Sequence, residues 1–244
     1  MRDTLYNDAA YYRMLFASRQ HDLPLYLELA AEAGGELLEL GIGAGRVALP
    51  LARAGFSVTG IDVAPDMLAS LAELAAREPE AVQARLSWLL GDARTAELGR
   101  KFRLVICPFN GLAHHHGLGE LAPLFATVAR HLAPGGLFAF DVLVPDPVLL
   151  RGGSSSVAWM RHPRTGEVCR CDEDVSYDQA KELLTIRTTL RFMEAEREPE
   201  VLTLVIQQFY PGQTEKLIAE LGFELVATRP ELTDAVGYVC RVAG

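Results

Sequence analysis

The stretch that decides the fold runs from residue 36 to residue 46 and reads ELLELGIGAGR. A short apolar run leads into glycines at three alternate positions, Gly41, Gly43 and Gly45, and then into an amphipathic run. This order predicts a β-strand, a tight turn and a helix. Glycines in such a turn let the backbone bend sharply and let a ligand lie directly against the main chain.

A second short apolar run, residues 57–62, ends in the carboxylate of Asp62. An acid at the tip of the neighbouring parallel strand is placed to accept both hydroxyls of a ribose. The two runs together predict a cofactor that contains a nucleoside.

Three features bear on which nucleoside is bound. The glycine spacing is G-x-G-x-G, and Arg46 stands where the pyrophosphate fingerprint G-x-G-x-x-G needs its third glycine. Glu39 precedes the turn, where a carboxylate would repel a pyrophosphate and attract a sulfonium and an α-amino group. After the next expected strand, residues 86–90, Asp92 and Ala93 offer a carboxylate and a backbone N–H to an adenine. Together these features favour S-adenosylmethionine over a dinucleotide.

The ordered motifs resemble those of class I S-adenosylmethionine-dependent methyltransferases. The matching segments are LELGIGAG at 38–45, VTGID at 58–62, Met67-Leu68, Gly91-Asp92-Ala93, LVICPFN at 104–110 and LAPGG at 132–136. They span roughly residues 36–142, the size of one such domain. The C-terminal part and the surroundings of His114 resemble the glycine and amino-sugar N-methyltransferases.

Composition limits the kind of partner. The chain has 244 residues, half of them hydrophobic, with 23 Lys and Arg against 32 Asp and Glu and a net charge of −9. An acidic chain without a basic run binds phosphate backbones poorly, so we expect a small-molecule acceptor and no nucleic acid. No signal-peptide pattern or long apolar run is present, so we expect a cytoplasmic protein without membrane contact. The four cysteines lack zinc spacing and are expected to be reduced thiols.

The order of apolar runs predicts an α/β fold, a doubly wound Rossmann-like sheet of seven mostly parallel strands. Residues 145–156 contain Pro and Gly-Gly-Ser-Ser-Ser and are interpreted as a linker. Period-two alternation in four runs between residues 157 and 209 then predicts an antiparallel sheet. We therefore assign residues 1–146 and 210–244 to the S-adenosylmethionine-binding domain and residues 147–209 to an insertion. Because it enters at the carboxyl ends of the parallel strands, we expect this insertion to be a substrate lid.

Several further residues are expected at the cofactor. Val63 follows Asp62, Met67 is placed to pack on the adenine, and Pro108 and Asn110 follow the strand at 102–107, where the reactive methyl should project. The resemblance places an N-terminal helix over the cofactor, which implies that the hydroxyl of Tyr6, Tyr11 or Tyr12 faces it; the contact is assigned here to Tyr11. It also implies that an arginine before the next helix, loosely matched by Arg19, pairs with the cofactor carboxylate.

The acceptor side is expected around His114, which matches a histidine near the acceptor in the resembling enzymes. A neutral imidazole there can take a proton from an amine or hydroxyl nucleophile, so His114 is the candidate catalytic residue. Trp159, Arg161 and Tyr210 are the candidate substrate contacts from the insertion side. We expect no metal site, because the neighbouring side chains of the run at 114–116 point in different directions.

The sequence thus predicts transfer of a methyl group from S-adenosylmethionine to a nitrogen or oxygen of a small metabolite. Two alternatives stay open: a non-catalytic module that binds a nucleoside and regulates a partner, and a nicotinamide-dependent reductase, which the glycine spacing disfavours. The acceptor is undetermined, and the insertion leaves room for pairing in a homodimer.

Overall fold

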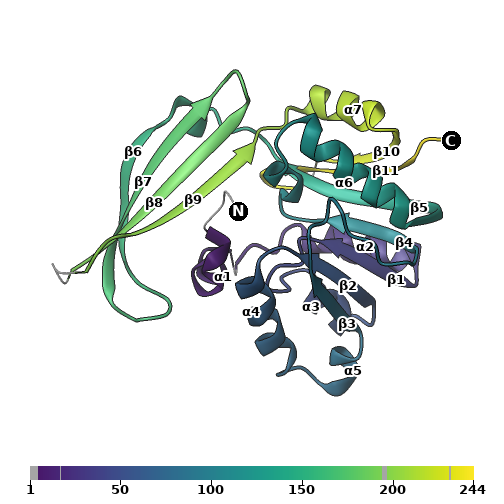
Figure 1. Ribbon diagram of the computed structural model, residues 1–244, viewed down its shortest axis with the longest axis horizontal. Coiled ribbons are helices and arrows are strands. Elements are labelled where there is room, and N and C mark those ends of the chain that lie inside the picture. Colours follow the sequence, from purple (N-terminus) through teal and green to yellow (C-terminus); the bar gives the residue numbers. More distant parts are fainter. Residues whose placement is uncertain (1–4, 17, 194–196, 231) are drawn as a thin grey trace.

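The computed structural model describes residues 5–16, 18–193, 197–230 and 232–244, apart from the side chains of residues 157 and 158. Within these residues two β-sheets and the helices around them form the molecule (Figure 1). The α/β fold class predicted from the sequence is confirmed.

The main sheet has seven strands in the order β10-β11-β5-β4-β1-β2-β3. β1 pairs in parallel with β2 and β4, β2 with β3 and β4 with β5, whereas β11 is antiparallel to both neighbours. Chain order therefore reverses between β1 and β4, and in open α/β sheets ligands bind at this reversal, outside the carboxyl ends of the strands. The strands are β1 (Glu36–Leu40), β2 (Ser57–Asp62), β3 (Leu86–Leu90), β4 (Phe102–Cys107), β5 (Leu132–Leu143), β10 (Phe223–Arg229) and β11 (Ala235–Val242).

Helices cover both faces of this sheet, and each face packs against its helices in a separate hydrophobic cluster. On one face α6 and α7 pack on aromatic side chains of β5, Phe138 and Phe140. On the other face α2, α3 and α4 pack on Leu37, Val58 and Leu104. The helices are α1 (Ala9–Phe16), α2 (Leu23–Ala33), α3 (Ala48–Arg53), α4 (Pro65–Ala75), α5 (Glu80–Gln83), α6 (Leu118–His131) and α7 (Pro211–Glu220), with 3-10 turns η1 (Leu5–Asn7), η2 (Gly111–His114) and η3 (Leu149–Arg151).

The second sheet is an antiparallel meander that projects from the main body (Figure 1). Its strands are β6 (Gly153–Arg161), β7 (Val168–Asp178), β8 (Leu183–Phe192) and β9 (Glu200–Gln207). Leu5 and Tyr11 of the N-terminal segment pack against Cys171 and Leu190 of this sheet, so the N-terminal segment lies between the two sheets.

Some predicted boundaries were wrong. Residues 153–156, interpreted as linker, belong to β6, because Ser154 and Ser155 pair with Asp174 and Glu173 of β7. The N-terminal helix expected over the cofactor is divided into the 3-10 turn η1 and the helix α1. β5 begins at residue 132 and includes the Pro-Gly-Gly run at 134–136, beside which its pairing with β4 is irregular between Phe102 and Leu104.

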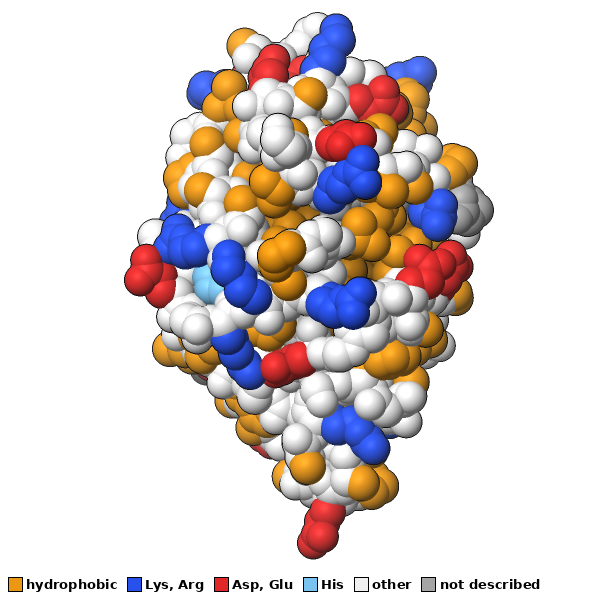
Figure 2. Space-filling model, turned by 90° about the vertical axis from the view of Figure 1, so that its right-hand side faces the viewer, with side chains coloured by type: hydrophobic (Ala, Val, Ile, Leu, Met, Phe, Trp, Pro, Cys, Tyr) orange, Lys and Arg blue, Asp and Glu red, His pale blue; other side chains and the backbone are white. Residues whose placement is uncertain are grey.

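Acidic and basic side chains are mixed with apolar ones on the face of the molecule shown in Figure 2. None of the helices among the described residues is long and apolar enough to cross a membrane. All four cysteines are free and buried.

Candidate functional site

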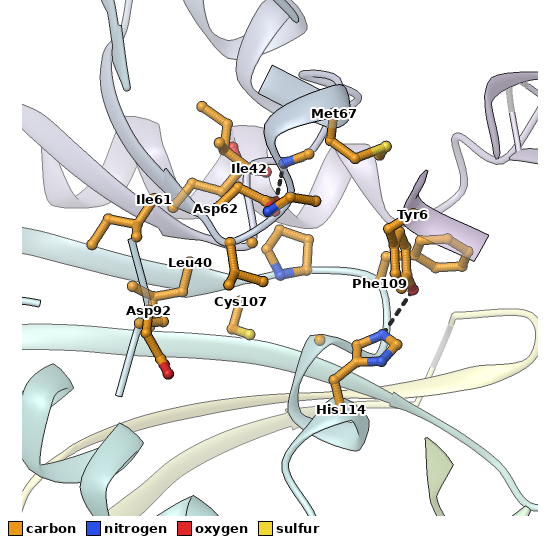
Figure 3. A pocket seen from close by; sticks show the side chains of 18 of the residues that line it. Tyr6, Leu40, Ile42, Ile61, Asp62, Met67, Asp92, Cys107, Phe109 and His114 are labelled. Carbon is orange, nitrogen blue, oxygen red and sulfur yellow. Dashed lines mark hydrogen bonds between the residues drawn. The ribbon is translucent and has the colours of Figure 1, made fainter. Parts of the chain in front are cut away.

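A pocket of about 580 Å³ opens at the carboxyl ends of β1, β2, β3 and β4, at the point where strand order reverses (Figure 3). Many of the residues predicted for the cofactor line this pocket. They are Glu39, Gly41, Gly43, Asp62, Val63, Met67, Asp92, Ala93 and Pro108. His114, the candidate catalytic residue, lines it as well.

The glycine turn forms the floor of the pocket and is joined to the tip of β2. Gly43 has φ +54°, a backbone conformation that residues other than glycine rarely adopt. Its N–H donates to Oδ2 of Asp62 at 2.7 Å. The other oxygen, Oδ1, accepts the N–H of Ala64 at 2.8 Å. Burial raises the pKa of Asp62, and these backbone N–H groups partly offset that shift.

Glu39 is a buried carboxylate in the pocket wall with an unsatisfied oxygen. Its side chain is 2% exposed, and Oε2 has no hydrogen-bond partner among the described residues. Burial raises the pKa of Glu39 well above its ordinary value, although the Arg46 guanidinium opposes the shift. A buried anion without a partner is costly, so this position suits a positively charged ligand group.

Asp92 and the pair formed by Tyr6 and His114 lie at opposite ends of the pocket, with Asp62 between them (Figure 3). Asp92 is half-buried and binds the guanidinium of Arg94, which lowers the pKa of its carboxyl group. Met67 is 1% exposed and packs with Tyr12 and Ala44.

The segment after β4 is held in an unusual conformation. Phe109 and Asn110 both have φ +56°, and their N–H groups donate to the buried carboxylate of Asp141 at 2.7 and 3.0 Å. Tyr26 donates its hydroxyl to the same carboxylate. Positive φ at residues other than glycine costs free energy and persists where the surroundings impose it. Asp141 thus shapes the loop that presents Phe109 to the pocket.

His114 is held by the N-terminal segment, because the Tyr6 hydroxyl lies 2.8 Å from its Nε2. The next two histidines also line the pocket. Burial lowers the pKa of His115 to about 4, so its ring is neutral at physiological pH. His116 donates from Nε2 to the backbone carbonyl of Val205 in β9, which links the pocket rim to the second sheet.

A family model described as a methyltransferase domain matches residues 37–136, the part of the chain that carries the glycine turn, Asp62, Asp92 and His114. Residues 37–136 are a methyltransferase domain.

The relatives of this methyltransferase domain include an amino-sugar enzyme. The dTDP-3-amino-3,6-dideoxy-alpha-D-glucopyranose N,N-dimethyltransferase of Streptomyces fradiae is 31% identical over 120 residues, which cover 49% of this chain and 44% of that enzyme. The chain spans less than half the length of the curated relatives it matches.

Likeness in fold extends beyond the methyltransferase domain. The CcbJ methyltransferase from Streptomyces caelestis superposes with a TM-score of 0.77 at 23% identity, covering 91% of this chain and 90% of that one. CalS10, an amino pentose methyltransferase from Micromonospora echinaspora solved with S-adenosylmethionine, gives 0.69 at 22% identity, with 94% and 95% covered. At these identities the likeness shows the fold alone. The aligned residues include most of both sheets, because they cover 91% and 94% of this chain.

Four residues predicted at the cofactor do not line the pocket of the methyltransferase domain. Tyr11 turns its hydroxyl toward Cys171, 4.0 Å away, while Tyr6 and Tyr12 line the pocket instead. Arg19 pairs with Asp234 at 2.7 Å, and its guanidinium lies over the Phe109 ring, 4.6 Å from the ring centroid. The remaining two are structural: Gly45 (φ +83°) leaves room for Leu71 and Leu49, and Asn110 accepts the N–H of Leu143.

The three predicted substrate residues also lie outside the pocket lining. Trp159 is 62% exposed on β6, and Arg161 donates to the carbonyl of Gly166 in its own hairpin. The Tyr210 hydroxyl lies 3.1 Å from that of Tyr177. Their contact with an acceptor therefore stays a prediction, since alternation along a strand does not say which face meets the site.

Sequence reasoning missed several lining residues, of which Arg46 is the most informative. Its guanidinium forms a bidentate pair with Asp22, at 2.7 and 2.6 Å, and lies 4.9 Å from the Phe109 ring centroid. Asp22 is fully buried. The sequence did carry a signal for this residue, because Arg46 stands where the pyrophosphate fingerprint has its third glycine. A charged side chain that is buried beside such a turn needs a partner of opposite charge. His115, His116 and Glu120 were missed because they follow an unpredicted 3-10 turn.

Proposed function

We propose that this chain binds S-adenosylmethionine in the pocket and transfers its methyl group to a nitrogen or oxygen of a small-molecule metabolite. The methyltransferase domain, and relatives that methylate an amino sugar or carry the name N-methyltransferase, support this class of reaction. When bound, the cofactor supplies an electrophilic methyl group on a sulfonium.

One observation carries the choice of cofactor: the buried carboxylate of Glu39 lines the pocket beside the glycine turn with Oε2 unpaired. A cationic group satisfies such a carboxylate, whereas the pyrophosphate of a nicotinamide dinucleotide would be repelled by it. The residues therefore fit a sulfonium cofactor with an amino group better than a dinucleotide.

The other residues have distinct parts in the proposal. Asp62 accepts the ribose hydroxyls, Asp92 and Ala93 hold the adenine, and the glycine turn lies under the methionine portion. The opposite end, with Tyr6 and His114, then faces the acceptor. His114 takes the proton that an amine or hydroxyl loses, and Tyr6 holds the imidazole in place.

In this proposal residues 147–209 form a lid over the acceptor. The hydrogen bond from His116 to Val205 and the packing of Tyr11 on Cys171 support it, because both join the pocket side to the second sheet. Closing a site in this way keeps water from the nucleophile. A cytoplasmic location and a homodimer stay predictions.

Isothermal titration with S-adenosylhomocysteine, S-adenosylmethionine and NADH tests the proposal. We expect saturable binding of the first two and none of NADH, and Asp62→Ala should weaken binding by about tenfold or more. Asp66→Ala is the matched control, because Asp66 is exposed on α4 and does not line the pocket. Absence of S-adenosylhomocysteine binding by the wild type would overturn the proposal. Tight binding without methyl transfer to any of a broad panel of amines and alcohols would favour the regulatory module.

A further inference from the structure

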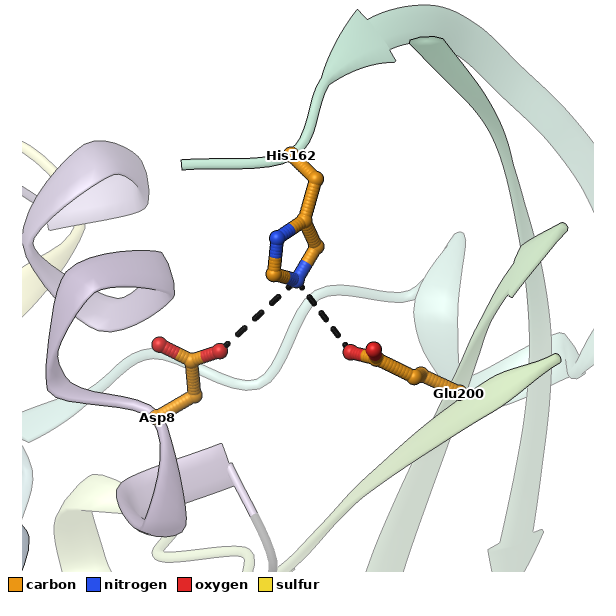
Figure 4. Close-up of side chains that lie close together, drawn as sticks. All are labelled: Asp8, His162 and Glu200. Carbon is orange, nitrogen blue, oxygen red and sulfur yellow. Dashed lines mark ion pairs between the residues drawn. The ribbon is translucent and has the colours of Figure 1, made fainter. Parts of the chain in front are cut away.

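Three metal-ligating side chains converge away from the pocket, where the N-terminal segment meets the second sheet (Figure 4). Asp8 precedes α1, His162 follows β6, and Glu200 begins β9. Nε2 of His162 lies 3.8 Å from Oδ2 of Asp8 and 3.2 Å from Oε2 of Glu200. One donor atom from each residue lies within 4.8 Å of the other two.

His162 is the unusual member of this group. Its ring is 1% exposed, and Nε2 makes no hydrogen bond of acceptable geometry with any described residue. Nε2 points between the two carboxylates (Figure 4). Asp8 is 4% exposed and Glu200 is half-buried, so the space is largely closed to water. A buried ring nitrogen aimed between two carboxylates, without a hydrogen bond of its own, indicates a ligand that binds all three.

The donor set and spacing suit a small transition metal ion. Imidazole and carboxylate ligands bind zinc at roughly 2.0–2.2 Å, so donors around a tetrahedral ion lie about 3.4 Å apart. The two distances from Nε2, 3.2 and 3.8 Å, bracket that value. A nitrogen donor also favours zinc-like ions over magnesium and calcium, which prefer oxygen alone.

The other carboxylate oxygens are already oriented. Oδ1 of Asp8 accepts the N–H of Tyr11 at 2.9 Å, and Oε1 of Glu200 accepts from Arg197 at 2.6 Å. Arg197 also pairs with Glu167 and lies over the Phe192 ring. Partners of this kind hold metal ligands in position and leave Oδ2 and Oε2 facing His162.

Two contacts must give way when an ion binds. Arg164 pairs with Oδ2 of Asp8 at 3.0 Å, but its side chain is 56% exposed and can turn into solvent. The Thr165 N–H donates to Nδ1 of His162 at 3.4 Å, a long contact that is lost when Nδ1 carries the ring proton. Both groups belong to the exposed turn after His162.

We propose that Asp8, His162 and Glu200 form a binding site for a divalent transition metal ion of the zinc class. The ion ties the N-terminal segment to the second sheet. Tyr6 and Tyr12, which flank Asp8 in the chain, line the pocket, so the ion stabilises a pocket wall without touching the reaction. This site does not depend on the proposed methyl transfer.

Titration of the chelator-treated full chain with zinc chloride tests the site. We expect saturable binding of about one ion per chain and a rise in Tm of about 5 °C or more at saturation. Asp8→Asn keeps an oxygen for the Tyr11 N–H and should weaken zinc binding by more than about tenfold. Glu200→Gln and His162→Gln should do the same.

His21→Gln is the matched control, because His21 pairs with Asp234 outside the cluster and should leave zinc binding unchanged. The histidines at 114–116 are the main competing zinc ligands. Zinc bound there would be unaffected by the substitutions at Asp8, His162 and Glu200, so these three variants distinguish the two sites. If wild type and Asp8→Asn bind zinc with equal affinity, or if wild type binds none, the site does not exist. Should any variant fail to fold, Glu200→Gln decides alone, since Glu200 is the most exposed of the three ligands.

Discussion

The hydroxyl of Tyr6 lies 2.8 Å from Nε2 of His114, although 108 residues separate the two in the chain. Their rings meet edge to face, with centroids 5.2 Å apart. The N-terminal segment therefore completes a pocket whose other walls come from the methyltransferase domain. His114 is held in one orientation by a residue that lies outside residues 37–136.

Loss of the Tyr6 hydroxyl should slow methyl transfer without preventing cofactor binding. We expect Tyr6→Phe to lower kcat/KM about fivefold, the value of one hydrogen bond, and His114→Gln to lower it about a hundredfold or more. Affinity for S-adenosylhomocysteine should change little in either variant. Tyr177→Phe, which removes a hydroxyl outside the pocket lining, is the control for rate. Equal rates for wild type and His114→Gln would remove His114 from the chemistry.

Glu39 should make the ligand-free protein less stable as pH rises. Burial raises its folded pKa above the unfolded value, so its contribution to stability is fully present below about pH 4.3 and is lost as pH rises through the folded pKa. Glu39→Gln removes this dependence and should raise the free energy of unfolding at pH 8 by about 1–3 kcal/mol. Urea denaturation at pH 5 and pH 8 measures the difference between the variant and wild type.

Glu39→Gln should also weaken binding of the cofactor, and it should weaken binding of the positively charged form more than binding of the uncharged form. S-adenosylmethionine carries a sulfonium that S-adenosylhomocysteine lacks, so Glu39→Gln should reduce affinity for the former by about tenfold more than for the latter. Calorimetry with both ligands checks this. An unchanged ratio of the two affinities would show that Glu39 does not face the sulfonium.

Much of the main sheet could be predicted from sequence because its signals are local. The bounds of β1, β2, β3 and β4 agree with the apolar runs at 36–40, 57–62, 86–90 and 102–107. A strand buried on both faces is continuously apolar, and glycine or an acid marks its end. Glu39, Gly43, Asp62 and Asp92 line the pocket for a related reason, since each stands at or just after the carboxyl end of one of these strands.

Contacts between distant segments were not predictable in this way. Tyr11 was chosen over Tyr6 and Tyr12, but neighbouring helical residues point about 100° apart, and only the packing of α1 decides which one meets the pocket. The Asp8, His162 and Glu200 cluster brings together three segments with no shared motif. Asp141 of β5 likewise accepts the N–H of Phe109, which follows the neighbouring strand β4.

Removing the charge of Arg46 should destabilise the fold strongly. Asp22 is fully buried, and its two carboxylate oxygens accept hydrogen bonds from this guanidinium at 2.7 and 2.6 Å. Arg46→Met leaves a buried carboxylate without that partner, and we expect a loss of about 3–5 kcal/mol in the free energy of unfolding. Arg53→Met, which breaks the exposed pair with Glu78, is the control and should change stability little. Similar urea midpoints for the two variants would contradict this assignment.

Gly60 is required by the close approach of Ile42 to the middle of β2. A Cβ at Gly60 would lie 2.1 Å from Cδ1 and 2.6 Å from Cβ of Ile42, so neither side chain rotation nor a small shift removes the clash. Gly60→Ala should therefore lower the free energy of unfolding by about 3 kcal/mol. It should also displace the glycine turn that carries Ile42 and so weaken cofactor binding.

Gly119→Ala is the matched control, because a Cβ at Gly119 would meet nothing within 4 Å. Alanine is the better helix former at this position in α6, so the free energy of unfolding should stay equal or rise by about 0.5–1 kcal/mol. Urea denaturation of the two variants gives the comparison. If Gly60→Ala is as stable as Gly119→Ala, β2 and the turn are not packed as closely as the structure has them.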